Sequence, residues 1–306
     1  MPLHFLTMLE LSSEQLRALL VRGHTLKRLR GSHAHPEPLR GKSVALIMEK
    51  ASTRTRISFE VGVHELGGHA LQLAGRDMQL GRDEPLDDTS RVLSGYVHAV
   101  VLRTFGHDRI EQIAAASRVP VINALTDLHH PCQILADLMT VEEHRKRGLD
   151  GLRVAWVGDG NNVAHSWILA AARFGFELSL ACPDGFLPAD AVLEQARAVG
   201  GGRVSVTSDV AEAARGADVV TTDVWASMGQ EGEAEARRKA FAGYAVDAQV
   251  MGLAARDALF LHCLPAHRGE EVTAEVIDGR WSRVWDEAEN RLHAQKALLE
   301  LVMARP

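Results

Sequence analysis

Short apolar runs alternate with stretches of helical periodicity along most of this chain, and this alternation constrains its fold more than any other feature. In the first half, the runs at Val44–Glu49, Ala70–Leu73, Ala99–Thr104 and Pro120–Asn123 indicate short buried strands. In the second half, "LRVAWVGDG", "ELSLACP", "RVSVTS", "ADVVTTD" and "ALFLHCLP" indicate further strands. Strands that alternate with helices usually pair in parallel and are covered on both faces. The sequence therefore predicts an α/β fold with doubly wound parallel sheets.

The length of the chain predicts two such domains, because 306 residues exceed what one hydrophobic core usually organises. A long helix from about Pro131 to Arg147 is expected to end at Gly148, since glycine commonly terminates helices. We therefore expect one domain at residues 1–148 and a second at residues 149–306. The final helix, at about residues 288–304, is expected to return toward the first domain and pack on it.

The composition argues against several classes of protein. A net charge of −6 is unlike that of a nucleic-acid binder, whose binding domain is normally basic. Three widely separated cysteines, Cys132, Cys182 and Cys263, indicate a reducing compartment with neither a disulfide framework nor a structural zinc site. No apolar stretch approaches the length of a membrane span, and the first residues lack the pattern of a secretory signal. We expect a cytoplasmic protein with no nucleic-acid or membrane partner.

The stretch "EKASTRTRISFE", residues 49–60, places hydroxyls and guanidiniums directly after an apolar run. Ser52 is expected to cap a helix, whose first backbone amides then form the positive end of the helix dipole. An anion at this place would receive backbone amides, hydroxyl groups and the Arg54 guanidinium. A capped helix with solvated arginines explains the stretch equally well on its own. The pattern is not a Walker A loop, so nucleotide triphosphate binding is not indicated.

Two further segments favour the anion site. Arg103 ends the apolar run in "VVLRTFGH", and His130 and Gln133 flank the start of a helix in "HHPCQ". Pro131 suits the first turn of that helix. A single histidine at a helix start is more often a surface or capping residue than a catalyst. Here it is accompanied by an amide and by arginines at neighbouring strand ends, where ligands of parallel sheets bind.

Together, the motifs "STRTR", "RTF", "HPCQ" and "HCLP" resemble the aspartate/ornithine carbamoyltransferase family, and the resemblance runs essentially from end to end. It implies that the first segment holds the phosphate of carbamoyl phosphate and that neither a metal nor a cofactor is needed. In this interpretation Arg103 and His130 contact the carbonyl oxygen, and Gln133 binds the carbamoyl amide. The implied carbamoyl phosphate site consists of Ser52, Thr53, Arg54, Thr55, Gln79, Arg103, His130, Gln133, Cys263, Leu264 and Arg291, of which Arg103, His130 and Cys263 are catalytic.

Gln79 lies in the polar segment "RDMQLGRDEP" and, taken alone, would be a solvated loop residue. The resembled family builds trimers, in which the residue at this place reaches carbamoyl phosphate in the neighbouring subunit's site. The resemblance therefore implies a homotrimer, or a multiple of trimers, with composite sites.

The second half contains "VGDGNNVAHSW", which matches the dinucleotide fingerprint at Gly158 and Gly160. Val163 stands where the third glycine would be, so the match is incomplete, although Asp184 near the end of the next predicted strand keeps a nicotinamide site open. Asn161 and Asn162 are expected at the start of a helix, whose amides also suit a carboxylate.

The segment "TTDVWASMG" places Asp223 at a strand end, where an acid is ordinarily a solvated turn residue. Its pattern resembles the ornithine branch of the family, and an acid there suits a cationic amino group. The resemblance implies that Cys263 and Leu264 lie beside the reacting amine, although a lone cysteine is usually a small buried hydrophobe. Without the resemblance, Arg291 would be a solvated helix residue. The implied ornithine-binding residues are Asn162, Asp223, Ser227 and Met228.

The polar stretch "GQEGEAEARRKAFAG", residues 229–243, allows two interpretations. It can be a lid that excludes water when the substrate binds, or a surface helix with Glu–Arg pairs four residues apart.

The expected activity is transfer of the carbamoyl group from carbamoyl phosphate to the δ-amine of L-ornithine, which gives L-citrulline and phosphate. Three alternatives remain at this point. The acceptor could be another amine, such as putrescine or an N-acylated ornithine. The protein could be a nicotinamide-dependent dehydrogenase, or a binding relative without catalytic activity.

Overall fold

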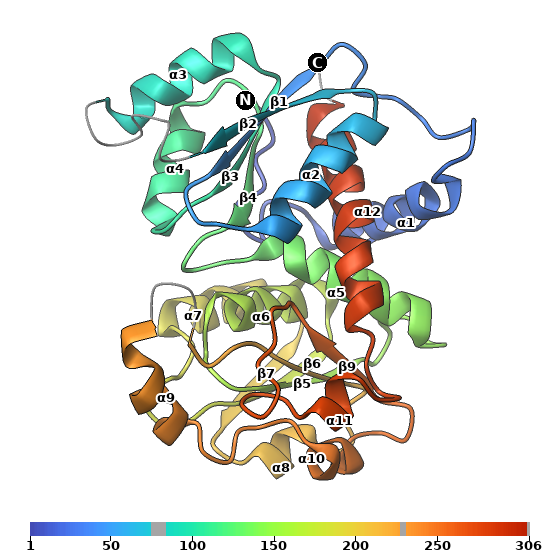
Figure 1. Ribbon diagram of the computed structural model, residues 1–306, viewed down its shortest axis with the longest axis vertical. Coiled ribbons are helices and arrows are strands. Elements are labelled where there is room, and N and C mark those ends of the chain that lie inside the picture. The colour runs from blue at the N-terminus through green and yellow to red at the C-terminus, as the bar shows by residue number, and fades with distance from the viewer. Residues whose placement is uncertain (75–83, 227–230, 305–306) are drawn as a thin grey trace. The chain divides into compact units, whose positions relative to one another are not determined.

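The computed structural model describes residues 1–74, 84–226 and 231–304 (Figure 1). The chain forms two compact units. Unit 1 consists of Met1–Met139 with Glu289–Pro306, and unit 2 consists of Thr140–Ala288. The units divide within two helices, α5 (Pro131–His144) and α12 (Val284–Met303).

Unit 1 contains a parallel four-stranded sheet with the order β2-β1-β3-β4. Its central strands are buried along nearly their whole length, which explains their continuous apolar sequences. Phe5 adds a parallel bridge to Ile122 at the β4 edge. The strands are β1 (Ser43–Met48), β2 (His69–Ala74), β3 (Ala99–Arg103) and β4 (Val121–Leu125), and the helices are α1 (Ser13–Leu29), α2 (Thr53–Glu65), α3 (Leu86–Tyr96) and α4 (His107–Ala116).

The part of α12 that belongs to unit 1 lies alongside α1 and α2 (Figure 1). Arg22 of α1 donates to Glu300 at 2.8 Å, and Lys296 donates to Glu65 of α2 at 2.6 Å. Gly62 permits this packing, since a Cβ atom there would lie 3.3 Å from the Lys296 side chain. The return of the C-terminal helix to the first unit, expected from the sequence, is confirmed.

Unit 2 contains a parallel five-stranded sheet with the order β7-β6-β5-β8-β9. Its strands are β5 (Arg153–Val157), β6 (Glu177–Ala181), β7 (Arg203–Thr207), β8 (Val219–Thr222) and β9 (Leu259–His262). Its helices are α6 (Asn162–Phe174), α7 (Asp190–Val199), α8 (Val210–Ala214), α9 (Ala234–Ala240), α10 (Ala248–Leu253) and α11 (Ala274–Ile277), with a 3₁₀ turn, η2, at Glu231–Glu233.

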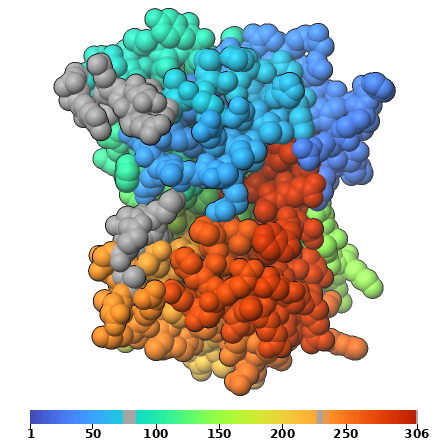
Figure 2. All heavy atoms as spheres, in the orientation of Figure 1, coloured from blue at the N-terminus to red at the C-terminus, as the bar shows by residue number. Residues whose placement is uncertain are grey.

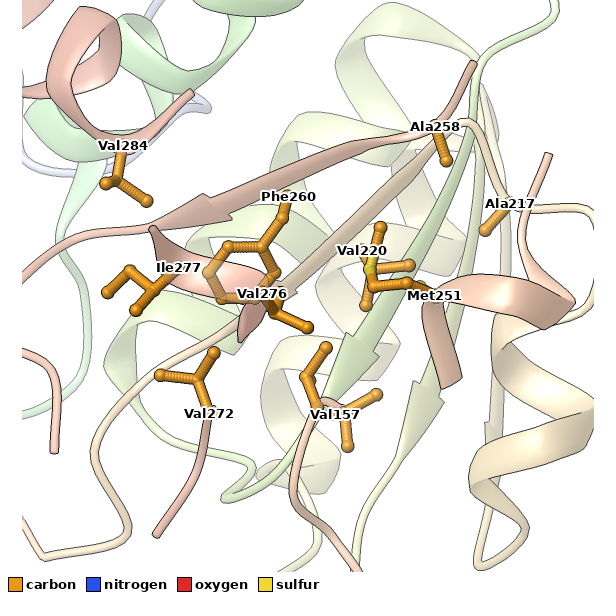
Figure 3. Close-up of a cluster of buried hydrophobic side chains, with 12 residues drawn as sticks. Val157, Ala217, Val220, Met251, Ala258, Phe260, Val272, Val276, Ile277 and Val284 are labelled. Carbon is orange, nitrogen blue, oxygen red and sulfur yellow. The ribbon is translucent and has the colours of Figure 1, made fainter. Parts of the chain in front are cut away.

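One apolar cluster covers a face of the second sheet (Figure 3). Val157, Val220 and Phe260 project from neighbouring strands and are fully buried. They pack against a layer contributed by α10, α11 and the chain before α11, which includes Met251 and Val276. Two helix-covered parallel sheets confirm the predicted α/β class.

The long helix ends earlier than the sequence predicted, at His144 instead of Arg147. The reason lies in the side chain of Arg145, which donates to the carbonyls of Gly148 and Asp150 at 2.7 and 2.8 Å. These bonds hold the following residues in turns, and Gly148 adopts the left-handed backbone that ends the segment. Within the described residues, no helix is long and apolar enough to cross a membrane.

Candidate active site

Each sheet brings polar side chains to the point where its strand order reverses. In unit 1 the chain runs outward from β1 to β2 and, on the other side, from β3 to β4. Ser52 follows β1 and Arg103 ends β3. In unit 2 the reversal lies between β5 and β8, which are followed by Asn161 and Asp223. Ligands of open parallel sheets bind at such switch points. The sequence-predicted residues therefore fall at two places suited to ligands, one in each unit.

The first place is built on the start of α2. The Ser52 hydroxyl accepts the Thr55 amide at 3.2 Å, so the predicted N-cap is confirmed. Thr53 and Arg54 are exposed, whereas Thr55 is buried. The first turn of a 13-residue helix thus presents backbone amides beside a guanidinium. This is an environment that attracts an anion.

Arg291 of α12 joins α2 to α5. Its guanidinium donates to the Thr55 hydroxyl at 3.0 Å and to Gln133 Oε1 at 2.6 Å. Gln133 in turn donates from Nε2 to Asp137 at 2.7 Å. Because Oε1 accepts and Nε2 donates, the orientation of the Gln133 amide is determined. Arg291 is 4% exposed, so its interpretation as a solvated helix residue was wrong.

His130 lies at the start of α5 and is buried. Burial lowers its pKa well below the ordinary value, and the positive charges of Arg291, Arg103 and Arg54 lower it further. The imidazole is therefore neutral near pH 7. Three guanidiniums close to one neutral histidine leave a surplus of positive charge that suits a phosphate.

Two neighbouring groups have hydrogen-bond partners of their own. Burial raises the pKa of the Cys132 thiol to about 12, and Cys132 donates to the Asn123 carbonyl at 3.3 Å. The cysteine of "HPCQ" is therefore a structural residue. Glu49, which follows β1, accepts from Arg109 at 2.9 Å and from the Thr104 hydroxyl. Sequence reasoning missed this pairing of Glu49, although its position at a strand end was a visible signal.

The second place centres on the Asp223 carboxylate, which is 7% exposed. Asp223 Oδ1 accepts the Val224 amide at 2.8 Å and the Cys263 thiol at 3.1 Å. Asp223 Oδ2 accepts from Asn161 Nδ2 at 2.9 Å. Asn162, which follows Asn161 in the sequence, is the first residue of α6. The acid is thus held from three directions by groups after β5, β8 and β9.

A buried pair supports the turn after β9. The Leu264 amide donates to His262 Nδ1 at 2.9 Å, so the proton of the neutral ring lies on Nε2. That nitrogen lies 3.2 Å from Glu271 Oε1, and both side chains are fully buried. Leu264 adopts φ 57°, a left-handed conformation that is uncommon outside glycine. The histidine–glutamate pair thus holds a strained backbone next to Cys263, a role that nothing in the linear sequence signalled.

Arg237 anchors α9 to the loop after β5. It donates to Asp159 Oδ2 and to the Trp225 carbonyl, each at 2.7 Å, and its guanidinium lies over the Phe186 ring. Residues after about 230, coloured orange, cover much of the visible face of unit 2 (Figure 2). Arg237 itself is 7% exposed, so this segment is more than a surface helix. Its Glu233 partner, four residues earlier, matches the predicted Glu–Arg spacing.

The partial dinucleotide fingerprint has a structural explanation. A Cβ atom at Gly160 would lie 2.2 Å from the Pro188 nitrogen, so this glycine serves the chain's own packing. Gly158 adopts φ 137°, and Val163 is a buried residue of α6. In the dinucleotide fingerprint such a glycine lets a pyrophosphate come close to the backbone. Here the backbone at Pro188 fills that space.

Among the described residues, two groupings have the composition of metal ligands, although the sequence had indicated no such cluster. In the grouping of Asp223, His262 and Cys263, the Cys263 thiol donates to Asp223, and each ring nitrogen of His262 has a hydrogen-bond partner. These groups satisfy their own hydrogen bonds, so the grouping is explained without a cation. The groupings are Asp223 with His262 and Cys263, and His267 with Glu270 and Glu271.

Three of the sequence-predicted residues, Gln79, Ser227 and Met228, lie outside the described residues. The remaining residues of the predicted carbamoyl phosphate set divide between the units. Cys263 and Leu264 belong to unit 2, whereas those from Ser52 to Gln133, together with Arg291, belong to unit 1.

Comparison with known proteins places the two halves in one family. Residues 3–143 match the carbamoyl-P binding domain of aspartate/ornithine carbamoyltransferase, and residues 150–302 match its Asp/Orn binding domain. The chain belongs to the aspartate/ornithine carbamoyltransferase family. It is 56% identical to the ornithine carbamoyltransferase of Halorhodospira halophila and 54% identical to that of Pelobacter propionicus, with 98% of each chain covered.

Solved structures of the family agree with this membership. The ornithine carbamoyltransferase of Pyrococcus furiosus matches with a TM-score of 0.94 at 47% identity, covering 99% of this chain and 97% of the other. That of Burkholderia thailandensis matches with a TM-score of 0.90 at 47% identity, covering 98% of both chains. The sequence-based resemblance is confirmed.

Proposed function

We propose that the protein transfers the carbamoyl group of carbamoyl phosphate to the δ-amine of L-ornithine, which gives L-citrulline and phosphate. The observation that carries the proposal is the set of guanidiniums around neutral His130 at the switch point of unit 1, in a chain of this family. The relatives at 52–56% identity named ornithine carbamoyltransferase support the choice of acceptor.

Carbamoyl phosphate binds to unit 1 in this proposal. The first turn of α2 and its guanidinium hold the phosphate, which departs with the electrons of the broken bond. Neutral His130 donates one hydrogen bond to the carbonyl oxygen without adding a further positive charge. Gln133 Oε1 accepts from the carbamoyl amide, since a second lone pair remains beside its bond to Arg291. The phosphate-binding residues of this unit are Ser52, Thr53, Arg54, Thr55, Arg103 and Arg291.

Ornithine binds to unit 2 in this proposal, and Asp223 decides between acceptors. A carboxylate at the switch point stabilises a cationic amino group, whereas the dicarboxylate aspartate would need a positive group there. Asn162, Ser227 and Met228 complete the site for the amino-acid end of ornithine. Cys263 and the Leu264 carbonyl lie beside the reacting amine.

The reaction requires a neutral δ-amine, because only the unprotonated nitrogen has a lone pair to donate. That lone pair attacks the carbonyl carbon, and the bond from this carbon to the phosphate oxygen breaks. The nitrogen then loses one proton, and phosphate leaves. Arg103 and His130 stabilise the negative charge that develops on the carbonyl oxygen.

We further propose a cytoplasmic homotrimer, or a multiple of trimers, that works in arginine metabolism. Residues 1–148 form the carbamoyl phosphate-binding domain and residues 149–306 the ornithine-binding domain, with the last helix on the first domain. The odd number and wide spacing of the three cysteines support a reducing compartment. The resemblance of Gln79 to a residue that reaches the neighbouring subunit's site supports the trimer.

Citrulline formation tests the proposal. Purified protein with carbamoyl phosphate should form product with L-ornithine and little with putrescine, N-acetylornithine or L-aspartate. The Asp223→Asn variant should lose affinity for ornithine far more than affinity for carbamoyl phosphate. Faster reaction with any of the other amines would overturn the choice of acceptor, and equal losses of both affinities would overturn the division between the units.

A further inference from the structure

Asn161 occupies an unusual position for a helix cap, because its side chain bonds both the helix and a site residue. Its Oδ1 accepts the amides of Val163 and Ala164 at 2.9 and 3.2 Å, which caps α6. Its Nδ2 donates to Asp223 Oδ2 at 2.9 Å. One side chain thus connects the start of α6 with the acid that follows β8.

The cap determines which way the Asn161 amide faces. Only the oxygen of an amide can accept from the two helix N–H groups, so the nitrogen must lie on the opposite side, toward Asp223. An exchange of the two atoms would set an N–H group against N–H groups and an oxygen against a carboxylate. The helix therefore fixes a hydrogen-bond donor against Asp223 before any substrate arrives.

The two oxygens of Asp223 are held by different elements. Oδ1 accepts from Val224 and Cys263, and Oδ2 accepts from Asn161. Among the bonds made by the described residues, loss of the Asn161 bond would leave the carboxylate held through Oδ1, around which it can turn. Because an ion pair with an ammonium group depends on orientation, such freedom weakens binding.

We propose that Asn161 is a positioning residue that fixes the Asp223 carboxylate for the ammonium group of the amino-acid substrate. The proposal rests on the proposed function, in which Asp223 binds ornithine. It assigns to Asn161 a task beyond capping α6, and the two tasks predict different results on substitution.

Three variants separate these tasks. Asn161→Ser keeps a cap of similar strength, but its side chain is too short to reach Asp223. Asn161→Asp also keeps the cap, but sets a second carboxylate within hydrogen-bond distance of the first. Asn161→Ala loses both functions. Asp209→Ala is the matched control, since Asp209 caps α8 through bonds to Ala211 and Glu212 and, within the part of the chain that the structure describes, makes no hydrogen bond to a site residue.

The measurements are the melting temperature and the KM values for L-ornithine and carbamoyl phosphate in citrulline formation. Asn161→Ser should keep the melting temperature and raise KM for ornithine by about 10-fold, the scale of one hydrogen bond to a charged group. KM for carbamoyl phosphate should stay the same. Asn161→Asp should raise KM for ornithine at least as much, and Asn161→Ala should also melt earlier. Asp209→Ala should melt earlier with both KM values unchanged.

A normal KM for ornithine in Asn161→Ser, together with a lower melting temperature in Asn161→Ala, would show a cap alone and overturn the proposal. Equal rises in both KM values would overturn it too, because a general disturbance of the fold has that effect. Absence of citrulline formation by the wild-type protein would instead overturn the proposed function, and the inference with it.

Discussion

The positive charge around His130 comes from arginines of three different elements. Arg54 belongs to the first turn of α2, Arg103 ends β3 and Arg291 lies in α12. All three lower the pKa of His130, which shows that they act on one small region. Arg56, two residues after Arg54 in the same helix, is exposed and is absent from this set. At the scale of single residues, the site is therefore defined by the arginines whose charges lower the pKa of His130.

Arg54→Ala and Arg103→Ala should each lower kcat by at least about a hundredfold, the loss expected for one preorganised group that stabilises developing charge. Lysine at either position should restore little, because the planar guanidinium matches the phosphate and carbonyl oxygens. Arg56→Ala is the control and should stay within about twofold of the wild type. Steady-state citrulline formation measures all of these, and nearly normal turnover in Arg54→Ala would exclude the phosphate role of this residue.

The low pKa of His130 predicts the shape of the pH profile. Its folded pKa lies well below 6.5, so the ring remains neutral from mildly acidic to alkaline pH and contributes no titration near 6.5. The δ-amine of ornithine, in contrast, resembles a lysine amine with a pKa of about 10. We therefore expect kcat/KM for ornithine to rise steadily from acidic to mildly alkaline pH. A profile that levels off just above pH 6.5 would contradict this assignment.

At the scale of elements, α9 and α12 are each held by a buried basic residue. Arg237 of α9 donates to Asp159 in the loop after β5 and to the Trp225 carbonyl in the chain after β8. Burial raises the pKa of Asp159 in spite of this partner. In α12, Lys296 is fully buried and donates to Glu65 of α2 at 2.6 Å. These helices are therefore positioned by polar contacts as well as by apolar packing.

Removal of the Arg237 side chain should destabilise unit 2 strongly. Arg237→Ala leaves Asp159, whose side chain is 15% exposed, without its cation, and should lower the free energy of unfolding by about 3 kcal/mol. Arg238→Ala removes an exposed pair with Glu270 and should cost less than about 1 kcal/mol. Urea denaturation compares the two, and similar losses would show that the Arg237 contacts contribute little.

His293 predicts a pH dependence of stability. Burial lowers its pKa to about 3, and the positive charges of Lys296, Lys27 and Arg30 also lower it. The negative charge of Glu65 raises the pKa and opposes them in part. The unfolded chain binds a proton near pH 6.5, whereas the native protein does so only near pH 3, so stability falls as the pH falls through this window.

The His293→Gln variant should therefore lose less stability between pH 7 and 4.5 than the wild type, by an amount on the order of 2 kcal/mol after solvent screening. His33→Gln, at an exposed position, is the control and should follow the wild type. Urea midpoints at the two pH values provide the measurement. Parallel losses in His293→Gln and the wild type would contradict a neutral buried ring.

At the scale of the whole molecule, the proposed trimer predicts complementation between chains. If Arg54 of one chain and Gln79 of the next serve one site, mixed trimers of Arg54→Ala and Gln79→Ala chains contain some intact sites. Random assembly of equal amounts should restore about one quarter of wild-type sites, because the two chains must meet in one order around the ring.

Each variant must first be shown to be impaired. The mixture is then unfolded, refolded and assayed for citrulline, and trimers mixed without dissociation serve as the control that should restore nothing. Activity of the refolded mixture at the mean of its parents would mean that Gln79 acts within its own chain.

The sequence by itself determined what local patterns encode. The alternation of apolar runs and helical periodicity predicted two parallel sheets, and residues at strand ends predicted the candidate ligand sites. The cap at Ser52 was visible as well, since a cap bonds backbone only two or three residues away. Asn161 was expected only at the start of a helix, and its role as the cap came from the structure. The end of α5 was misplaced because it depends on the Arg145 side chain and not on Gly148 alone.

The tertiary structure alone decided which distant residues meet. Arg291 reaches Thr55 across 236 residues, and Asn161 reaches Asp223 across 62. The buried pair of His262 and Glu271 and the bond of Arg237 to Asp159 likewise depend on how loops are packed. No local pattern encodes such contacts, because each partner alone has the signature of an ordinary polar residue. Only the folded chain removes these groups from water, and it is this burial that makes their pairing obligatory.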